Sequence, residues 1–197
     1  MTFPEFLQST KTDMQEISLN ILDIAENSVR AEASLIEVTV KENIAEDILF
    51  FTIKDNGCGM DAQMVKRVTD PFVTTRTTRK VGLGISLLKA AAQQAGGDVF
   101  LESNVGVGTT ITATFSYSHI DRQPLGDIAS AMVSLISLNP DIDFVYTHIY
   151  NSEEFTLDTR ELKAVLGEKV KLNEPSVAVW MGEYINSGLT EIYGGAS

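Results

Sequence analysis

The chain has 197 residues, 44% of them hydrophobic, which is enough apolar material for one folded domain or for a domain with a smaller appendage. The 27 acidic and 15 basic residues give a net charge of -12, and this charge disfavours nucleic acid and anionic membranes as main partners because like charges repel. The single cysteine permits no intrachain disulfide, and the absence of a signal-peptide pattern or a long apolar run leads us to expect a cytoplasmic protein.

The first predicted element is an amphipathic helix over residues 13–31, whose apolar positions recur at helical spacing. Asp23 and Asn27 lie four residues apart on its polar face, so their side chains are neighbours. Their oxygens could both point at one hydrated Mg²⁺ or at a water beside a phosphate. A solvated helix face would give the same pattern, and the helix alone does not decide between the two interpretations.

Two strands are predicted next, over residues 35–41 and 48–54, because both segments alternate and are rich in β-branched and aromatic residues. The second strand ends in a turn with the sequence DNGCGM. A buried Asp55 carboxylate in this turn could accept a hydrogen bond from the exocyclic amine of adenine, and Gly57 and Gly59 would let the backbone approach the ring. An ordinary tight turn explains these residues equally well.

A short helix over residues 62–68, capped by Asp61, precedes a polar and basic segment at 70–81 that we predict to be a mobile loop. A further helix is predicted over residues 83–95, where Gly96-Gly97 stops it.

The start of that helix is suited to phosphate binding. Free backbone N–H groups at a helix N-terminus and the helix dipole favour anions. The preceding loop supplies three cations that could neutralise the outer phosphates: Arg76, Arg79 and Lys80. A glycine-rich loop that merely begins a helix would also fit, because a single Gly-x-Gly is weak evidence.

A hairpin is predicted from strands at 99–103 and 109–117, which flank the glycines at 106 and 108. The Thr109 hydroxyl is a candidate partner of Asp55, reached directly or through water. The order of helix, strands, loop, helix and hairpin predicts an α/β two-layer sandwich with helices on one face of a mixed sheet.

The character of the chain changes near residue 120, so we expect a nucleotide-binding domain at 13–118 and a small α+β C-terminal domain or extension at 119–197. In the second part we expect a helix at 127–138, a hairpin of strands at 144–150 and 154–157, and two more helices starting at Thr159 and Pro175. Four residues of the last helix share a face that could be core or could serve docking or dimerisation: Trp180, Tyr184, Ile185 and Leu189.

Five motifs in this order resemble the boxes of the GHKL superfamily, which groups gyrase, heat-shock chaperone, histidine kinase and mismatch-repair ATPases. They are LDIAENS at 22–28 for the N box, DNGCGM at 55–60 for the first glycine box, DPFVTTR at 70–76 for the F box, and GLG at 82–84 and GVGT at 106–109 for the other glycine boxes. The resemblance covers residues from about 15 to 117 and implies a Bergerat-type sandwich that binds ATP with Mg²⁺.

By this resemblance Asn27 would ligate Mg²⁺, Asp55 would read adenine, and residues 72–82 would form the ATP lid. The implied nucleotide-binding set is Asn27, Asp55, Gly57, Gly59, Met60, Phe72, Thr75, Arg76, Arg79, Lys80, Gly82, Leu83, Gly84 and Thr109. Asp23 is the candidate catalytic residue, although many members have Glu at this position. The shorter side chain reduces its reach toward a water, so hydrolysis is less certain than binding.

The chain also looks like stand-alone ATP-binding proteins of anaerobic bacteria that are encoded beside hydrogenase genes. We therefore expect an Mg-ATP-binding regulatory protein that hydrolyses ATP slowly or transfers phosphate to a protein partner, such as a redox enzyme or a regulator, and that could form a homodimer. The alternative is a non-catalytic sensor or docking module that ATP switches by ordering the lid.

Overall fold

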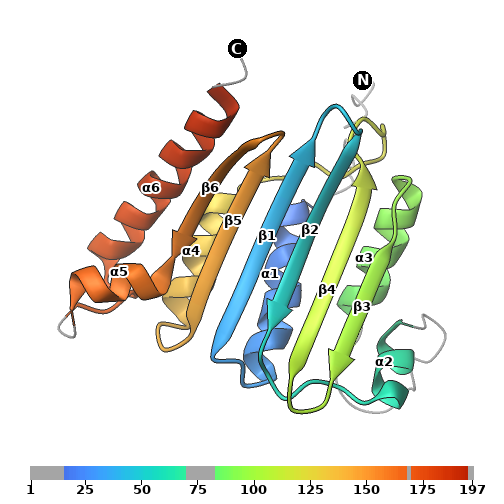
Figure 1. Cartoon of the computed structure of the whole chain (residues 1–197), viewed down its shortest axis with the longest axis horizontal. Coiled ribbons are helices and arrows are strands. Elements are labelled where there is room, and N and C mark those ends of the chain that lie inside the picture. The colour runs from blue at the N-terminus through green and yellow to red at the C-terminus, as the bar shows by residue number, and fades with distance from the viewer. Residues whose placement is uncertain (1–15, 70–82, 168–169, 195–197) are drawn as a thin grey trace, which may run out of the picture.

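The computed structural model describes residues 16–69, 83–167 and 170–194, and six strands in these residues form one mixed sheet (Figure 1). The strand order is β3-β4-β2-β1-β5-β6. The pairing of β1 with β5 is parallel, and all other neighbours are antiparallel. The strands are β1 (Leu35–Asn43), β2 (Ile48–Asp55), β3 (Val99–Asn104), β4 (Gly108–Ser116), β5 (Asp143–Tyr150) and β6 (Glu153–Asp158).

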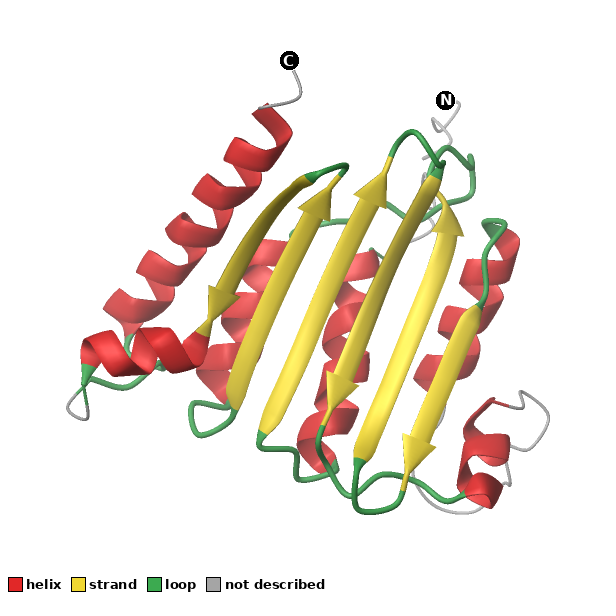
Figure 2. Cartoon of the chain, in the orientation of Figure 1, coloured by secondary structure: helices red, strands yellow, loops and turns green. Residues whose placement is uncertain are grey.

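Helices α1 (Ile17–Arg30), α3 (Leu83–Gln94) and α4 (Ile128–Leu138) lie against one face of this sheet, as Figure 2 shows. The other described helices lie toward its edges: α2 (Ala62–Thr69) packs on α3 and β3, α5 (Thr159–Leu166) on β5, and α6 (Pro175–Gly194) on α4, β5 and β6. Alternate residues of β1 and β2 are buried against the helices, while the other face of both strands is partly exposed. The predicted two-layer sandwich with a mixed sheet is therefore confirmed, and none of the described helices is long and apolar enough to cross a bilayer.

The chain passes the expected domain boundary without leaving the sheet. The boundary falls in the connection between β4 and α4, and β5 then pairs with β1 from Leu35 to Glu42. α4 packs against α1, and one buried apolar cluster contains residues from both parts, such as Ile24 and Met132. The strands of the C-terminal part thus extend the first sheet, and the division into a domain at 13–118 and a domain or extension at 119–197 stays a prediction.

The predicted apolar face of the last helix, α6, is partly buried and partly exposed. Ile185 and Leu189 are buried, whereas Trp180 and Tyr184 are 45% and 42% exposed. The reason is the position of α6 beside β6, the last strand of the sheet (Figure 1), where only part of the helix has a strand to cover. Only the buried half of this face is core.

A buried polar cluster joins β1, β5 and α6. The fully buried His148 ring contacts the Tyr146 hydroxyl at 2.7 Å through Nδ1 and the Glu42 carboxylate at 3.0 Å through Nε2. Tyr193, near the end of α6, donates a hydrogen bond to the same carboxylate. Burial opposes ionisation of Glu42, but the hydrogen bonds from His148 and Tyr193 outweigh burial and hold the pKa of Glu42 below its ordinary value.

We expect the free energy of unfolding to fall as the pH drops below about 4.5, the ordinary pKa of Glu42. The folded-state pKa is lower than the unfolded one, so ionised Glu42 stabilises the fold above this pH, and the stabilisation is lost as protonation proceeds. Urea unfolding between pH 3 and pH 7 would measure it. The Glu42→Gln variant should be about 1–3 kcal/mol less stable at pH 7 and should lose less stability on acidification; equal acid sensitivity in both chains would contradict this role.

Candidate nucleotide site

Asp55 is the last residue of β2 and lies on the buried face of the strand, in phase with Phe51 and Ile53. Its side chain therefore points toward α1 and is only 9% exposed. Ser28 of α1 donates a hydrogen bond of 2.6 Å to Oδ2. The backbone N–H groups of Gly57 and Thr109 donate to Oδ1 at 2.9 and 3.2 Å. Donors from a helix, a turn and a neighbouring strand thus fix the carboxylate in one orientation.

Thr109 reaches Asp55 differently from the prediction. Its backbone N–H makes the direct contact, while its hydroxyl pairs with Ser103 of β3 at 2.9 Å. Ser103 also accepts a hydrogen bond from the Met60 backbone N–H at 2.8 Å. The strand register explains why the backbone of Thr109 contacts Asp55 while its hydroxyl contacts Ser103, because Thr109 lies directly opposite both residues in the sheet.

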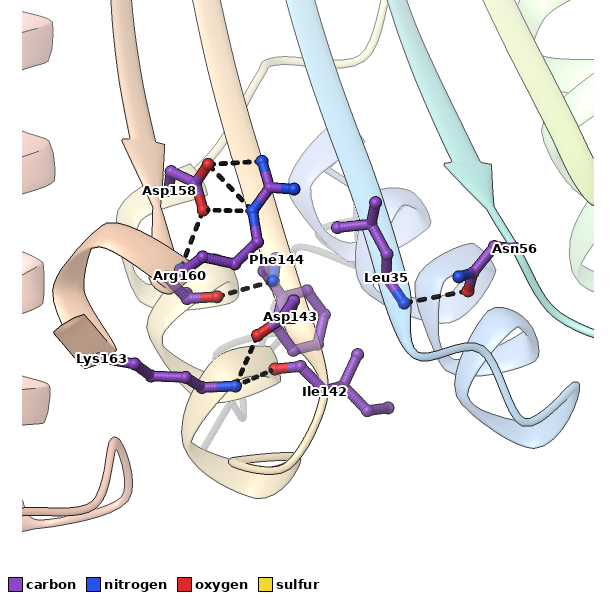
Figure 3. Close-up of polar contacts among 9 residues, drawn as sticks. Leu35, Asn56, Ile142, Asp143, Phe144, Asp158, Arg160 and Lys163 are labelled. Atoms are coloured by element: carbon purple, nitrogen blue, oxygen red, sulfur yellow. Dashed lines mark hydrogen bonds and ion pairs between the residues drawn. The ribbon is translucent and has the colours of Figure 1, made fainter. Parts of the chain in front are cut away.

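The turn after Asp55 is tied to the beginning of β1. The side-chain oxygen Oδ1 of Asn56 accepts hydrogen bonds of 2.9 Å from the backbone N–H groups of Ser34 and Leu35, and the second of these is drawn in Figure 3. Its amide nitrogen donates to the Ser34 hydroxyl. The Cys58 N–H donates to the Ala31 carbonyl just after α1. These contacts hold the turn against the C-terminal end of α1.

Three glycines around this turn are required by the packing of the protein on itself. A Cβ on Gly57 would lie 2.6 Å from the Ala31 carbonyl oxygen. Gly59 has φ +67, and its Cβ would lie 2.0 Å from the Asn104 oxygen. Gly108 has φ +129, and its Cβ would lie 1.9 Å from the backbone carbonyl oxygen of Asp55. The glycines at 57 and 59 were expected because they would let an adenine ring approach the backbone. The close packing of the protein explains both glycines without a ligand.

Gly84, in the first turn of α3, is different. A Cβ there would meet nothing within 4 Å, and its φ lies outside the left-handed region. The packing of the described residues therefore gives no reason for glycine at this position. Close approach of a ligand to the helix N-terminus would supply one.

Asp23 and Asn27 face the surface of α1 one turn apart, as predicted. The Asp23 side chain is exposed and the Asn27 side chain is half-buried. Arg30 donates a hydrogen bond of 3.3 Å to the Asn27 side-chain oxygen and forms an ion pair of 2.9 Å with Glu26. No group of three or more His, Cys, Asp or Glu that could hold a metal occurs within residues 16–69, 83–167 and 170–194. Asn27 is the one candidate oxygen ligand for Mg²⁺ that the resemblance assigns among the described residues, and phosphates and water would have to complete the shell.

Of the remaining residues predicted to bind nucleotide, only those at the start of α3 belong to the described part of the chain. Leu83 and Gly84 begin this helix. The other members of the set lie outside the described residues: Phe72, Thr75, Arg76, Arg79, Lys80 and Gly82.

Sequence reasoning missed two hydroxyl residues of the site, Ser28 and Ser103. Ser28 entered the prediction only as the last residue of the LDIAENS motif. A small polar residue among the buried positions of α1, directly after Asn27, is a signal that a polar group of another element lies opposite. Ser103 carries no comparable signal, because its role depends on how the strands pair.

A family model described as "Histidine kinase-, DNA gyrase B-, and HSP90-like ATPase" matches residues 12–119, more than half of the chain. The chain is 31% identical over 109 residues to a putative sensor protein of Shewanella frigidimarina, covering 55% of this chain and 16% of that protein. It is 33% identical over 112 residues to the sensor histidine kinase WalK of Bacillus subtilis, covering 53% of this chain and 18% of that kinase. It therefore spans less than a fifth of the length of these relatives.

Among solved structures, the N-terminal domain of a DNA repair protein has a similar fold. The TM-score is 0.53 at 13% sequence identity, with 78% of this chain and 57% of that chain covered. The likeness extends beyond the residues that the family model matches, so it includes some of the C-terminal part.

Proposed function

The chain belongs to the family of histidine kinase-, DNA gyrase B- and HSP90-like ATPases, and from this premise we propose that it binds ATP with Mg²⁺ at the end of the sheet where Asp55 lies. The observation that carries the proposal is the Asp55 carboxylate, which is buried and oriented by donors from three elements inside the family-matched region. A buried carboxylate at the rim of a site is suited to accept a hydrogen bond from an exocyclic amine.

The other residues take the roles that the resemblance implies. Thr109 supports Asp55, and Met60 lies beside the adenine end. The N-terminus of α3, which begins at Leu83 and Gly84, would face the phosphates. The resemblance also assigns Gly82 and the cations at 76–80 to the phosphates, and these lie outside the described residues. Asn27 would hold Mg²⁺, which when bound neutralises phosphate charge.

Gly84→Ala separates a phosphate role from a packing role. Alanine fits the helical backbone, so we expect the free energy of unfolding to stay equal or to rise by up to about 1 kcal/mol. The added methyl group would obstruct a close phosphate, so ATP affinity should fall about tenfold or more. Urea unfolding and nucleotide titration of the same variant measure both quantities. Unchanged ATP affinity would remove Gly84 from the site.

We further propose that bound ATP is hydrolysed slowly or transferred to a protein partner, which would make the chain a regulatory enzyme. Asp23 is exposed and one helical turn from Asn27, where it can accept a proton from an attacking water or hydroxyl. The alternative is a non-catalytic sensor, in which ATP only shifts the conformation of residues 72–82.

Asp23→Asn is expected to reduce partner-independent ADP production by about 10²-fold or more while leaving ATP affinity within about twofold. Labelled γ-phosphate distinguishes the outcomes. Release as inorganic phosphate indicates an ATPase, and label on a co-expressed protein indicates a kinase. Tight ATP binding with neither free phosphate nor labelled protein would favour the non-catalytic sensor. Equal rates of ADP production in the unchanged chain and in Asp23→Asn would exclude Asp23 as the base.

A further inference from the structure

A second concave surface lies at the C-terminal edge of the sheet, away from the nucleotide site. It is a groove of about 650 Å³ between β6, α5 and α6. Apolar side chains dominate its walls: Leu157, Leu162, Val165, Val177, Trp180 and Tyr184. We refer to this surface as the α5–α6 groove.

The groove brings several exposed large apolar side chains together in one place. Val165 is 85% exposed, and the Trp180 and Tyr184 rings stack at 5.0 Å and 10° while both remain over 40% exposed. Val179, on the adjoining side of α6, is 62% exposed. Val179 lines a separate hollow between α4 and α6. Apolar side chains are therefore exposed on two adjoining sides of α6, which suits a macromolecular partner better than a small molecule. Trp and Tyr are also the residues most often found at the energetic centre of protein interfaces.

The walls of the groove are held in place without a ligand. Thr159, at the first turn of α5, accepts a hydrogen bond of 2.7 Å from the Phe144 N–H, and Lys163 bonds Asp143 and the Ile142 carbonyl (Figure 3). α6 lies so close to β6 that a Cβ on Gly188 would meet the Phe155 ring. A rigid surface loses little conformational entropy on binding, so the groove is already arranged for association.

The charged residues that line the groove are Asp158 and Glu161, and both are acidic. Arg160 and Lys163 of α5 are neutralised by Asp158 and Asp143 in ion pairs of 2.6 and 2.7 Å. Glu161 lines the groove, Glu183 follows on the adjoining side of α6, and α6 itself contains no Lys or Arg. A second copy of this chain would bring the same acidic margin and a net charge of -12, so like-charge repulsion disfavours it.

We propose that the α5–α6 groove docks a protein partner through an amphipathic segment with aliphatic or aromatic side chains on one face and Lys or Arg at its margins. This inference does not depend on nucleotide binding. The apolar face would cover Val165, Trp180 and Tyr184, and the basic margins would meet Glu161 and Glu183.

The full chain can be tested with an 18-residue synthetic helix of Leu and Lys and with a control peptide in which Glu replaces every Lys. Trp180 is the only tryptophan, so its fluorescence reports on the groove directly. We expect the Leu/Lys peptide to change Trp180 emission saturably and the Leu/Glu peptide to bind at least about tenfold more weakly. Val165→Lys should weaken the Leu/Lys peptide at least about tenfold, whereas Phe100→Lys, at a 58% exposed residue of β3 on the opposite edge, should not.

Equal binding of both peptides, or equal effects of Val165→Lys and Phe100→Lys, would overturn the proposal. A dimer in analytical ultracentrifugation that Val165→Lys dissociates would instead identify a second copy as the occupant. Phe6 belongs to the N-terminal segment 1–15, outside the described residues. If Phe6→Ser changed Trp180 emission in the absence of peptide, the chain's own N-terminal segment would be the occupant, and a separate protein partner would be refuted.

Discussion

Asp55→Asn should lower ATP affinity on the order of 100-fold with little loss of fold stability. Asn can keep an oxygen toward the N–H groups of Gly57 and Thr109, and its amide can donate to Ser28, whose hydroxyl then accepts. The fold thus keeps its hydrogen bonds. Adenine, however, meets an amide donor where the carboxylate accepted, which costs a charge-assisted hydrogen bond of about 2–3 kcal/mol.

Displacement of a fluorescent ATP analogue, followed by anisotropy, measures this affinity. Ser28→Ala is the matched control, because it removes one of the donors to Asp55 but leaves the carboxylate. It should weaken ATP only severalfold, through less exact orientation of the carboxylate. If Asp55→Asn bound ATP as tightly as the unchanged chain, Asp55 would not be the adenine contact.

Gly108→Ala should have the largest effect on stability, lowering the free energy of unfolding by about 3 kcal/mol or more. Its φ of +129 is unfavourable for alanine, and the new Cβ would lie 1.9 Å from the backbone oxygen of Asp55. Because two backbones meet there, no side-chain rotation can relieve the clash, and the hairpin must separate from the end of β2. ATP binding should weaken with it, since Thr109 moves away from Asp55.

Gly106→Ala is the control for this prediction. Gly106 also has a positive φ of +76, but a Cβ there meets nothing within 4 Å. Alanine should therefore cost only about 1–2 kcal/mol, the penalty for the left-handed conformation alone. Urea unfolding of both variants compares the two costs. Equal destabilisation would show that the close approach to Asp55 contributes little.

The sandwich was predictable because each of its elements has a local pattern. The alternation in β1 and β2 and the helical spacing of Ile17, Ile21 and Ile24 directly reflect one buried face. The position of β5 was not predictable. β5 joins β1 in parallel, about a hundred residues away along the chain, and no local pattern specifies which edge of a sheet a later strand covers. An extension of the sheet could therefore be read as a second domain.

The arrangement of residues around Asp55 was predictable in part. Asp55 and its turn follow from chain order and a motif, because an acidic residue at the end of a buried strand is unusual. The way Thr109 contacts Asp55 was not, because it depends on strand register. The sequence left open whether Trp180 and Tyr184 are core or exposed for a related reason, since their exposure depends on the position of α6 relative to the edge of the sheet.

Calorimetric titration of the purified chain with ATP, with and without Mg²⁺, tests the central claim most directly. We expect saturable binding at micromolar ATP, weaker binding when Mg²⁺ is chelated, and loss of the binding heat in Asp55→Asn. If the chain is folded by circular dichroism and shows no binding heat at any temperature tested, the motifs around Asp55 serve as scaffold only, and the proposed nucleotide function is wrong.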